Sequence, residues 1–329
     1  MIDFSITSKF KTGLLLIILL CPALIFAEDS NNVTFTAEQT SHFKSEMEGS
    51  FSGIGVNIEL VPDGIAIKGI IPGGGAEKAG LKAGEIITAI DDQSSAGLTI
   101  QQVVARLIGP VDSKVVLEIQ DPAGASRQVE ITRSMIVITG VESRQLENHI
   151  WLLRISIVNK LTPNEVRKQL AQMKEQNAAG IILDLRSSGG GMIKSLVEIA
   201  SMFLPKGQTM WLYKPKDGDI KPVVNNNEQL TDLPMVVLID AKADSGELIA
   251  AALKRSHRAK ILGQKTSGFI ATRNIIEKPD GTSEAVVTGD FYMTDTERIT
   301  EVGIEPDIAL DPNSPEEQII QKCVESLGV

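Results

Sequence analysis

The spacing of hydrophobic residues changes near residue 150 of this 329-residue chain. Before that point, short segments of alternating apolar and polar residues are separated by glycines, which is typical of strands with one buried face. After it, continuous apolar runs alternate with amphipathic segments, which predicts buried strands alternating with helices. The expected strands of the first part are Val56–Leu60, Ile65–Ile71, Ile86–Ile90 and Val115–Ile119. The pattern therefore predicts a compact β-rich unit followed by an α/β layered unit.

Helices are also expected in the first part. Two short ones are predicted near Ala76–Ala79 and Ile100–Leu107, inside the β-rich unit. Ahead of that unit, Phe43 and Met47 are four residues apart, the spacing of one helical face, so residues 28–50 are expected to form a helical lead-in.

In the second part, Ile150–Ile157 is predicted to be a strand. The sequence Thr162-Pro163-Asn164-Glu165 then has the form of a capping box with proline at the first helical position, so a helix is expected from there to about Gln176. Later segments follow the same alternation. They are expected strands at Gly180–Leu185 and Pro234–Ile239, expected helices at Met192–Phe203 and Ser245–Arg255, and strands and turns over Asn274–Ala309 with a hairpin loop at residues 279–282.

The N-terminus has the features of a secretory signal peptide. Lys9 and Lys11 precede an apolar run from Gly13 to Leu20, and a small residue follows at Ala27. We therefore expect residues 1–27 to be a signal peptide and the protein to be exported to the periplasm or cell envelope. A retained N-terminal membrane anchor is the alternative, because short anchors and signal peptides overlap in length. Lipidation at Cys21 is disfavoured, since the preceding residue is not small.

Composition narrows the possible classes of function. There are 32 Lys and Arg against 42 Asp and Glu, a net charge of −10, and only 4% of residues are aromatic, which argues against nucleic-acid binding. Without the signal peptide, Cys323 is the single cysteine and cannot form an internal disulfide. His42, His149 and His257 are scattered and are expected to be structural. No Cys/His spacing suggests a metal site, and we expect no cofactor.

Two glycine-rich segments are candidate binding loops. Residues 51–56 lead into a strand, so converging backbone N–H groups could hold a terminal carboxylate while the strand edge accepts an extended peptide. Residues 184–191 join a buried strand to a helix, where backbone amides could bind an oxyanion or a phosphate. A tight turn without chemistry remains the alternative for each loop. The second loop lacks the lysine of a Walker loop, which disfavours nucleotide binding.

Residues 72–87, Pro-Gly-Gly-Gly-Ala-Glu-Lys-Ala-Gly-Leu-Lys-Ala-Gly-Glu-Ile-Ile, resemble the signature of a PDZ domain. The match extends through Ile100–Pro110, the helix that would flank a peptide groove. The resemblance implies a PDZ domain at residues 51–136. Its implied peptide-binding residues are Gly53, Ile54, Gly55, Val56, Ile58, Val104 and Leu107.

The signal peptide, the PDZ-like unit and the segment Ile181–Arg186 with its following glycines together resemble the carboxyl-terminal processing, or tail-specific, serine peptidases. The resemblance covers about residues 40–312 and includes Gly303–Asp307. It implies an α/β peptidase core of the crotonase and Clp-protease kind over residues 137–329, with an inserted or preceding PDZ domain. In this family the PDZ domain recognises substrate tails, and a serine and a lysine form the catalytic dyad.

The residues implied for catalysis differ from that family's. An ungapped match through Glu247 and the following helix places Asp244 at the nucleophile, Phe269 at the general-base lysine and Arg273 at the orienting glutamine. A carboxylate is a poor nucleophile toward amides, and a phenyl ring cannot accept a proton. Gly190 and the backbone N–H of Ser245 still match the implied oxyanion donors. We expect Asp244 and Arg273 to form an ion pair, with two separate solvated charges as the alternative.

Three hypotheses about function follow. The first is an exported protein that binds extended peptides or C-terminal tails but is impaired as a peptidase, with an active relative or a second copy as further possible partners. The second is an active serine endopeptidase that uses Ser245, displaced by one position, with Lys265, Lys242 or His42 as the base. Ser245 is equally explained as a helix-capping residue. The third is an envelope scaffold that uses the core only for oligomerisation.

Overall fold

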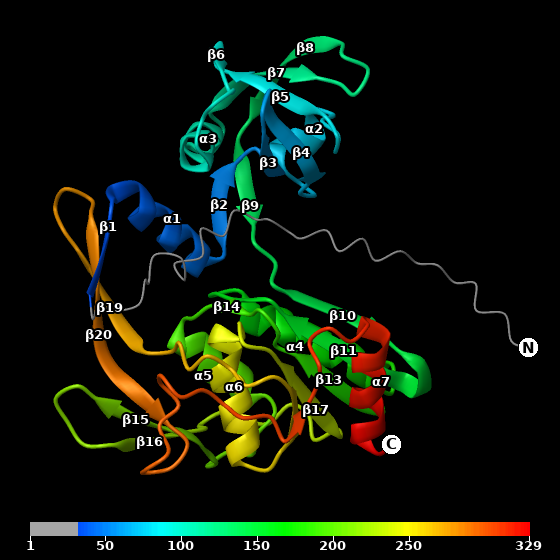
Figure 1. Ribbon diagram of the computed structural model, residues 1–329, viewed down its shortest axis with the longest axis vertical. Helices are drawn as coiled ribbons and strands as arrows, with labels where there is room; N and C mark the ends of the chain where they lie inside the picture. Colours follow the sequence, from blue (N-terminus) through cyan, green and yellow to red (C-terminus); the bar gives the residue numbers. More distant parts are fainter. Residues whose placement is uncertain (1–31) are drawn as a thin grey trace, which may run out of the picture. The chain divides into compact units, whose positions relative to one another are not determined.

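The computed structural model describes residues 32–329 and is shown in Figure 1. The predicted signal peptide at residues 1–27 lies outside the described residues. The described chain forms two compact units, one of Ser50–Val137 and one that combines residues 32–49 with Ile138–Val329. The smaller unit is therefore an insertion in the sequence of the larger one.

The smaller unit is built around an antiparallel sheet with the strand order β3-β4-β5-β7-β8, with β6 paired to β5. Its strands are β2 (Ser50–Gly53), β3 (Val56–Val61), β4 (Gly64–Ile70), β5 (Ile86–Ile90), β6 (Gln93–Ser94), β7 (Lys114–Gln120), β8 (Ser126–Thr132) and β9 (Ser134–Val137), and its helices are α2 (Gly75–Lys78) and α3 (Ile100–Leu107). Alternate residues such as Ile65, Ile67 and Leu117 are fully buried, as the sequence pattern predicts. Strand β3 pairs only with β4 and so forms one edge of the sheet.

A six-stranded sheet with the order β10-β11-β13-β17-β18-β21 forms the centre of the larger unit, parallel except for β10. A second, antiparallel sheet contains β1, β20, β15 and β16, with β19 paired to β20. The strands are β1 (Asn32–Phe35), β10 (Val141–Gln145), β11 (Ile150–Ile155), β12 (Ile157–Val158), β13 (Gly180–Asp184), β14 (Gly189–Gly190), β15 (Thr209–Pro215), β16 (Lys221–Val224), β17 (Met235–Ile239), β18 (Lys260–Gly263), β19 (Thr272–Glu277), β20 (Ser283–Tyr292) and β21 (Ile308–Ala309). The helices are α1 (Ala37–Glu48), α4 (Thr162–Glu175), α5 (Ile193–Ser201), α6 (Asp244–Arg255) and α7 (Glu316–Leu327), and Glu147–His149 is a 3-10 turn.

Helices cover both faces of the central sheet (Figure 1). The apolar faces of α4, α5 and α6 pack on one side with the inward residues of β11, β13 and β17. The C-terminal helix α7 covers the other side through Ile319, Ile320 and Cys323. All five residues of β13 and all five of β17 are buried, which confirms the strands predicted from continuous apolar runs.

The predicted lead-in helix is confirmed as α1, and the segment also contains strand β1, which pairs with β20 far along the sequence. One prediction about local structure was wrong. The capping box at Thr162 is not formed. Its hydroxyl donates to the carbonyl of Ile157 at 3.0 Å, and the side chain of Glu165 accepts from the N–H of Gly140 instead. Tertiary partners thus replace the local cap that the sequence motif predicts.

Candidate functional site

Ser245 lies in the first turn of α6 and is almost completely buried. Its hydroxyl donates to the carbonyl oxygen of Gly189 at 2.8 Å, with the carbonyl of Ser188 at 3.2 Å. Its backbone N–H donates to the same Ser188 carbonyl at 3.1 Å. Both the hydroxyl and the N–H that the sequence comparison implied as an oxyanion donor are therefore bound to the glycine-rich loop.

Gly190 occupies a backbone position that only glycine can take. Its φ is +84°, and a β-carbon there would lie 2.4 Å from the carbonyl oxygen of Val158. The neighbouring N–H groups of Gly189 and Gly191 donate to Ser156 and Val158, at 2.9 and 3.0 Å. Because successive strand N–H groups point to opposite sides, that of Gly190 is directed away from β12. Gly190 is exposed, and its role as an oxyanion donor stays a prediction.

Asp244 is half-buried at the start of α6. Burial, with a smaller contribution from the nearby charge of Asp240, raises its pKa to about 6. Within the described part of the chain the carboxylate of Asp244 has no hydrogen bond or ion pair, so the expected pair with Arg273 was wrong. The guanidinium of Arg273 instead lies 5.8 Å from the ring centroid of Phe269, and burial lowers its pKa.

Neither Lys265 nor Lys242 is hydrogen-bonded to Ser245. Lys265 forms an ion pair with Glu305 at 2.8 Å, and Lys242 is exposed. The side chain of His42 lies outside the described atoms. Phe269, at the position implied for the base, is 40% exposed and apolar. Among the described residues, no basic side chain is hydrogen-bonded to the Ser245 hydroxyl.

Glu247 is fully buried one turn into α6 and ties this helix to the segment that carries Phe269. Its Oε1 accepts hydrogen bonds from the hydroxyl of Thr266 and, at 3.0 Å, from the N–H of Gly268. Burial raises the pKa of Glu247 to about 7 although these hydrogen bonds oppose the shift, and the charge of Asp244 adds to it. Sequence reasoning found Glu247 as a motif residue but could not assign it a contact.

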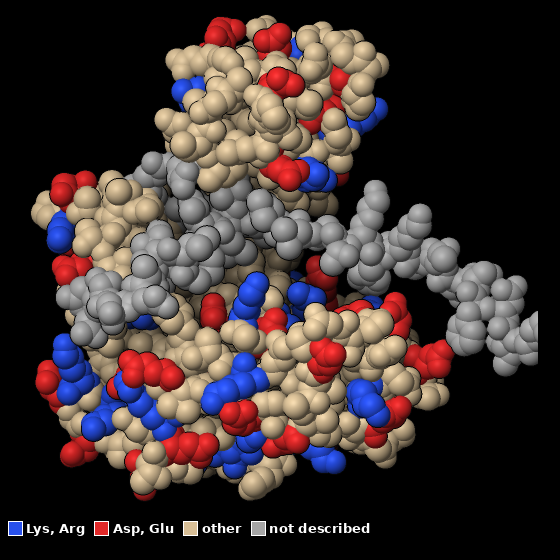
Figure 2. All heavy atoms as spheres, viewed as in Figure 1, with Lys and Arg blue, Asp and Glu red and all other residues tan. Residues whose placement is uncertain are grey.

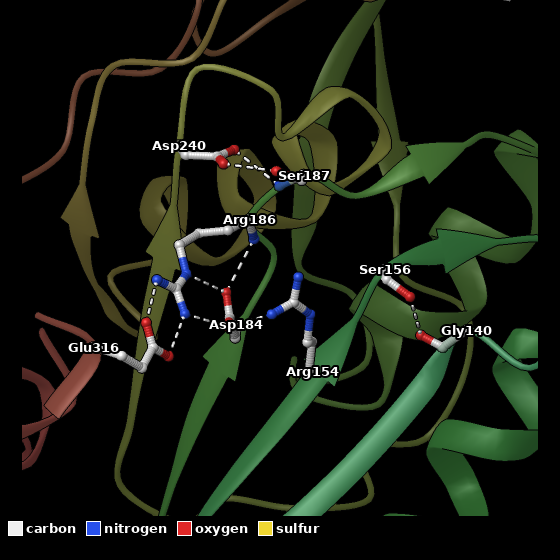
Figure 3. Close-up of polar contacts among 8 residues, drawn as sticks. All are labelled: Gly140, Arg154, Ser156, Asp184, Arg186, Ser187, Asp240 and Glu316. Carbon is white, nitrogen blue, oxygen red and sulfur yellow. Dashed lines mark hydrogen bonds and ion pairs between the residues drawn. The ribbon is translucent and has the colours of Figure 1, made fainter. Parts of the chain in front are cut away.

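A charged network fixes the start of the glycine-rich loop (Figure 3). Arg186 donates two hydrogen bonds to Asp184, at 2.9 and 2.8 Å, and two to Glu316 of α7, at 2.9 and 2.8 Å. Arg154 lies 3.8 Å from the buried Asp184 carboxylate. These bonds raise the pKa of Arg186, although burial opposes the shift. Asp184-Leu185-Arg186 could be recognised as a motif in the sequence. Nothing in the sequence indicated that Arg186 would pair with Glu316, 130 residues away.

Asp240 holds the next residue of the loop. It accepts hydrogen bonds from both the N–H and the hydroxyl of Ser187, each at 2.9 Å (Figure 3). Ser187 has a φ of +51°, a conformation that costs energy for a non-glycine residue, and the two bonds offset that cost. The loop is thus held at Arg186 and Ser187 before it reaches the glycines.

The residues expected to bind peptide fall into two groups in the smaller unit. Ile54, Ile58 and Leu107 are 2%, 2% and 5% exposed and belong to its core, and their contact with a peptide stays a prediction. Val56 and Val104 are half-buried and remain accessible. Val56 lies on the edge strand β3, and Val104 lies on helix α3.

The loop before β3 has the shape expected of a glycine-rich turn. Gly55 has a φ of +81°, and a β-carbon there would lie 3.1 Å from the Cα atom of Gly74. The carbonyls of Ile54 and Gly55 accept hydrogen bonds from Ala76 and Ile71. The carbonyls of Ile54 and Gly55 are thus turned toward the rest of the unit.

Comparison with known proteins assigns the family. Residues 149–310 match the family model of peptidase family S41, and residues 67–121 match a PDZ domain model. The carboxyl-terminal-processing protease of Picosynechococcus sp. is 30% identical over 86% of this chain and 70% of its own length. The carboxy-terminal processing protease CtpA of Bacillus subtilis is 28% identical over 85% of this chain and 60% of its own length. This chain belongs to the carboxyl-terminal processing protease family.

The fold agrees with this family. The solved structure of a photosystem II D1 C-terminal processing protease is similar with a TM-score of 0.51 and 25% identity, over 89% of this chain and 82% of the other. The predicted α/β peptidase core with a β-rich PDZ domain is thereby confirmed. The chain spans 60% and 65% of the length of two of the curated relatives that it matches.

Figure 2 shows acidic and basic side chains interspersed over the face of the larger unit that is in view. The residues that the structure describes contain no group of three His, Cys, Asp or Glu side chains placed to hold a metal. Among the helices over residues 32–329, none has both the length and the hydrophobicity required to cross a membrane.

Proposed function

We propose that this member of the carboxyl-terminal processing protease family binds extended peptides or protein C-terminal tails and does not cleave them efficiently. The binding element is a PDZ domain that we place at residues 51–136, with the peptide paired along the edge of β3. The terminal carboxylate of the bound peptide is held by the loop around Gly53 and Gly55. The edge position of β3 and the accessible Val56 and Val104 support this assignment.

The hydrogen bond from the Ser245 hydroxyl to the carbonyl of Gly189 is the observation on which the proposal of impaired proteolysis rests. A serine nucleophile must transfer its proton to a base, and the proton of Ser245 is directed to the carbonyl oxygen of Gly189. The side chains at the positions implied for the nucleophile and the base, Asp244 and Phe269, supply neither a hydroxyl nor a proton acceptor of the required kind. Gly190 still offers an N–H to a carbonyl, so the core can hold a peptide bond without attacking it.

Export to the periplasm or cell envelope is part of the same proposal. It is supported by the signal-like pattern at residues 1–27 and by the occurrence of bacterial processing proteases among the relatives. Fractionation of cells that express the full chain, with mass spectrometry of the mature N-terminus, tests it. A protein that starts at Met1 and stays in the cytoplasm would contradict export.

Peptide binding is tested by fluorescence anisotropy with a labelled apolar peptide that ends in a free carboxylate, and with its C-terminal amide. The proposal predicts saturable binding of the free acid and affinity at least about tenfold weaker for the amide, because the amide lacks the charge that the loop N–H groups stabilise. The same peptides are then incubated with the protein and analysed by mass spectrometry. Binding without cleavage supports the proposal, and equal affinity for both peptides contradicts the PDZ assignment.

A further inference from the structure

Strand β19 forms an edge of the antiparallel sheet in the larger unit. Among the described residues it pairs with β20 alone, and the two strands make the hairpin at the left of Figure 1. Residues 272–277 read Thr-Arg-Asn-Ile-Ile-Glu, with two adjacent β-branched residues and no proline. Another edge of this sheet, β16, contains Lys221 and Pro222, and a proline cannot donate the N–H that an added strand requires. The sequence of β19 therefore permits the pairing that the sequence of β16 opposes.

The backbone of β19 alternates between groups bonded to β20 and groups directed away from it. At the turn, the N–H of Lys278 donates to the carbonyl of Thr282 at 2.8 Å, so these two residues form a hydrogen-bonded pair. Bonded pairs alternate along antiparallel strands, and Ile276 and Asn274 are therefore bonded to β20 as well. The N–H and C=O groups that point away from β20 are those of Arg273, Ile275 and Glu277.

These three outward residues match a second copy of the same strand. When two antiparallel copies of β19 are related by a twofold axis through Ile275, Arg273 of each copy lies opposite Glu277 of the other. Every pair in this register consists of outward-directed residues, so about six backbone hydrogen bonds can form between the two strands. Opposite charges that face each other across two strands stabilise the pairing, and the twofold axis supplies this pair twice.

The side chains are compatible with this register. Glu277 is exposed, and its ion pair with Lys44 at 2.6 Å joins two half-exposed side chains, so a second cation can approach it. Burial lowers the pKa of Arg273, and an opposing carboxylate would counter that effect. Ile276 is 52% exposed on the other face of β19 and would lie diagonally across from Ile276 of the second copy, where the two apolar side chains cover each other.

We propose that β19 is a homodimerisation edge, at which a second copy of this chain adds its own β19 in antiparallel orientation about Ile275. Arg273 and Glu277 set the register. The occupant is a second copy, because the edge carries both members of the ion pair at the spacing that its own sequence requires. The interface joins the antiparallel sheets of two larger units into one sheet, and it does not depend on peptide binding by the smaller unit.

Sedimentation velocity of the full chain measures the association. We expect a reversible monomer–dimer equilibrium with a Kd on the order of 100 μM or tighter, because a six-residue edge makes a small interface. Arg273→Glu and Glu277→Arg each place like charges opposite one another, and each should weaken dimerisation about tenfold or more. An equimolar mixture of these two variants restores both pairs of opposite charges and should dimerise about as well as the unsubstituted protein.

The mixture is also the control for folding, because a misfolded variant could not restore association. Lys221→Glu is the matched control for charge, since Lys221 is an exposed residue of the edge strand β16, and it should dimerise like the unsubstituted protein. A mixture that stays monomeric, equal weakening by Lys221→Glu, or an unsubstituted chain that is monomeric at every concentration overturns the proposal. A dimer that neither charge variant weakens contradicts it as well, because the copies then meet at another surface.

Disulfide trapping locates the twofold axis. In Ile275→Cys the two introduced thiols lie opposite each other, so we expect cross-linked dimer to form under oxidising conditions at a rate that rises with protein concentration. Lys221→Cys is the control on β16, and the unsubstituted protein measures cross-linking by the native cysteines, of which Cys323 is buried. Cross-linking of Ile275→Cys no faster than that of Lys221→Cys overturns the proposed register.

Discussion

The hydroxyl of Ser245 donates a hydrogen bond to the carbonyl oxygen of Gly189 at 2.8 Å. A backbone carbonyl is too weakly basic to accept the proton of an attacking serine, so this contact fastens α6 to the glycine-rich loop and does not activate the oxygen. This contact supports a structural role for Ser245, next to Asp244 at the position that the family resemblance implies for the nucleophile.

Replacing Ser245 by alanine is expected to lower the free energy of unfolding by about 1 kcal/mol, the net contribution of one buried hydroxyl hydrogen bond. Peptide affinity should not change. Chemical denaturation and peptide titration of Ser245→Ala measure the two effects. Ser256→Ala serves as a control, since the Ser256 hydroxyl bonds only to carbonyls of its own helix. A fall in peptide affinity in Ser245→Ala alone would contradict this structural role.

We expect the ionisation of Glu247 to make the free energy of unfolding depend on pH. Its pKa in the folded protein is about 7 against 4.5 for the ordinary carboxyl group, so between these values the folded state retains a proton that the unfolded state has released. Stability from this group is therefore lost as the pH rises from about 4.5 to about 7, by up to about 3 kcal/mol. Asp244, whose pKa is also raised, acts in the same direction.

Substitution of Glu247 by glutamine tests this assignment, because the amide cannot ionise. Relative to the unsubstituted protein, Glu247→Gln should gain stability at pH 8 compared with pH 5, as measured by urea denaturation at both values. In Glu247→Gln, stability should still decline as the pH rises, but less steeply, because Asp244 still ionises. Glu317→Gln, at an exposed position of α7, is the control and should follow the unsubstituted protein. Parallel curves for Glu247→Gln and the control would show that Glu247 does not bind this proton.

We expect Arg186 to contribute more to the free energy of unfolding than Glu316, its partner in α7. Arg186→Ala leaves the carboxylate of Asp184, 1% exposed, with Arg154 at 3.8 Å and the N–H of residue 186 as partners, and we expect a loss of about 3 kcal/mol. Glu316→Gln should cost about 1 kcal/mol or less, because that side chain is half-exposed and screened by solvent. Lys206→Ala, in an exposed pair with Glu228, should have no measurable effect.

The free energies of unfolding of Arg186→Ala, Glu316→Gln and Lys206→Ala, measured by urea denaturation, rank the contributions of these three side chains. Equal losses for Arg186→Ala and Glu316→Gln would mean that the attachment of α7, and not the buried Asp184, sets the value of this network.

Gly55 should be required for peptide binding. Its φ of +81° and the 3.1 Å approach to Gly74 mean that alanine would displace the loop before β3, so Gly55→Ala is expected to weaken binding of a free-carboxylate peptide about tenfold or more. Gly124→Ala is the matched control: its φ is +89°, but a β-carbon there meets nothing within 4 Å. Peptide titration by anisotropy measures both. Comparable affinities in the two variants would place the peptide elsewhere.

Periodicity and glycine spacing were sufficient to predict the elements that depend on local sequence. Helix α3 begins and ends at the predicted residues, and β13 and β17 follow from their apolar runs. Strand β1 could not be predicted, because four residues gain their strand conformation only from pairing with β20. The capping box at Thr162 failed for a similar reason, since its hydroxyl bonds to Ile157.

The candidate site shows the same division. Its residue types could be read from the sequence, but not their contacts. The link from Arg186 to Glu316 spans 130 residues, and the direction of the Ser245 hydroxyl depends on where the carbonyls of the glycine-rich loop lie. The predicted pair of Asp244 and Arg273 was chemically reasonable, yet Arg273 lies over Phe269 and Asp244 is near the like charge of Asp240.

The central claim is that the chain binds tails without a working dyad. It is tested most directly by incubating the protein with an unfolded substrate and following cleavage by mass spectrometry. Asp244→Ser combined with Phe269→Lys restores the implied nucleophile and base in the comparison protein. The account predicts no cleavage by the unsubstituted protein or by Ser245→Ala, and cleavage, if any, only by the double variant. Cleavage by the unsubstituted protein that Ser245→Ala abolishes would contradict it.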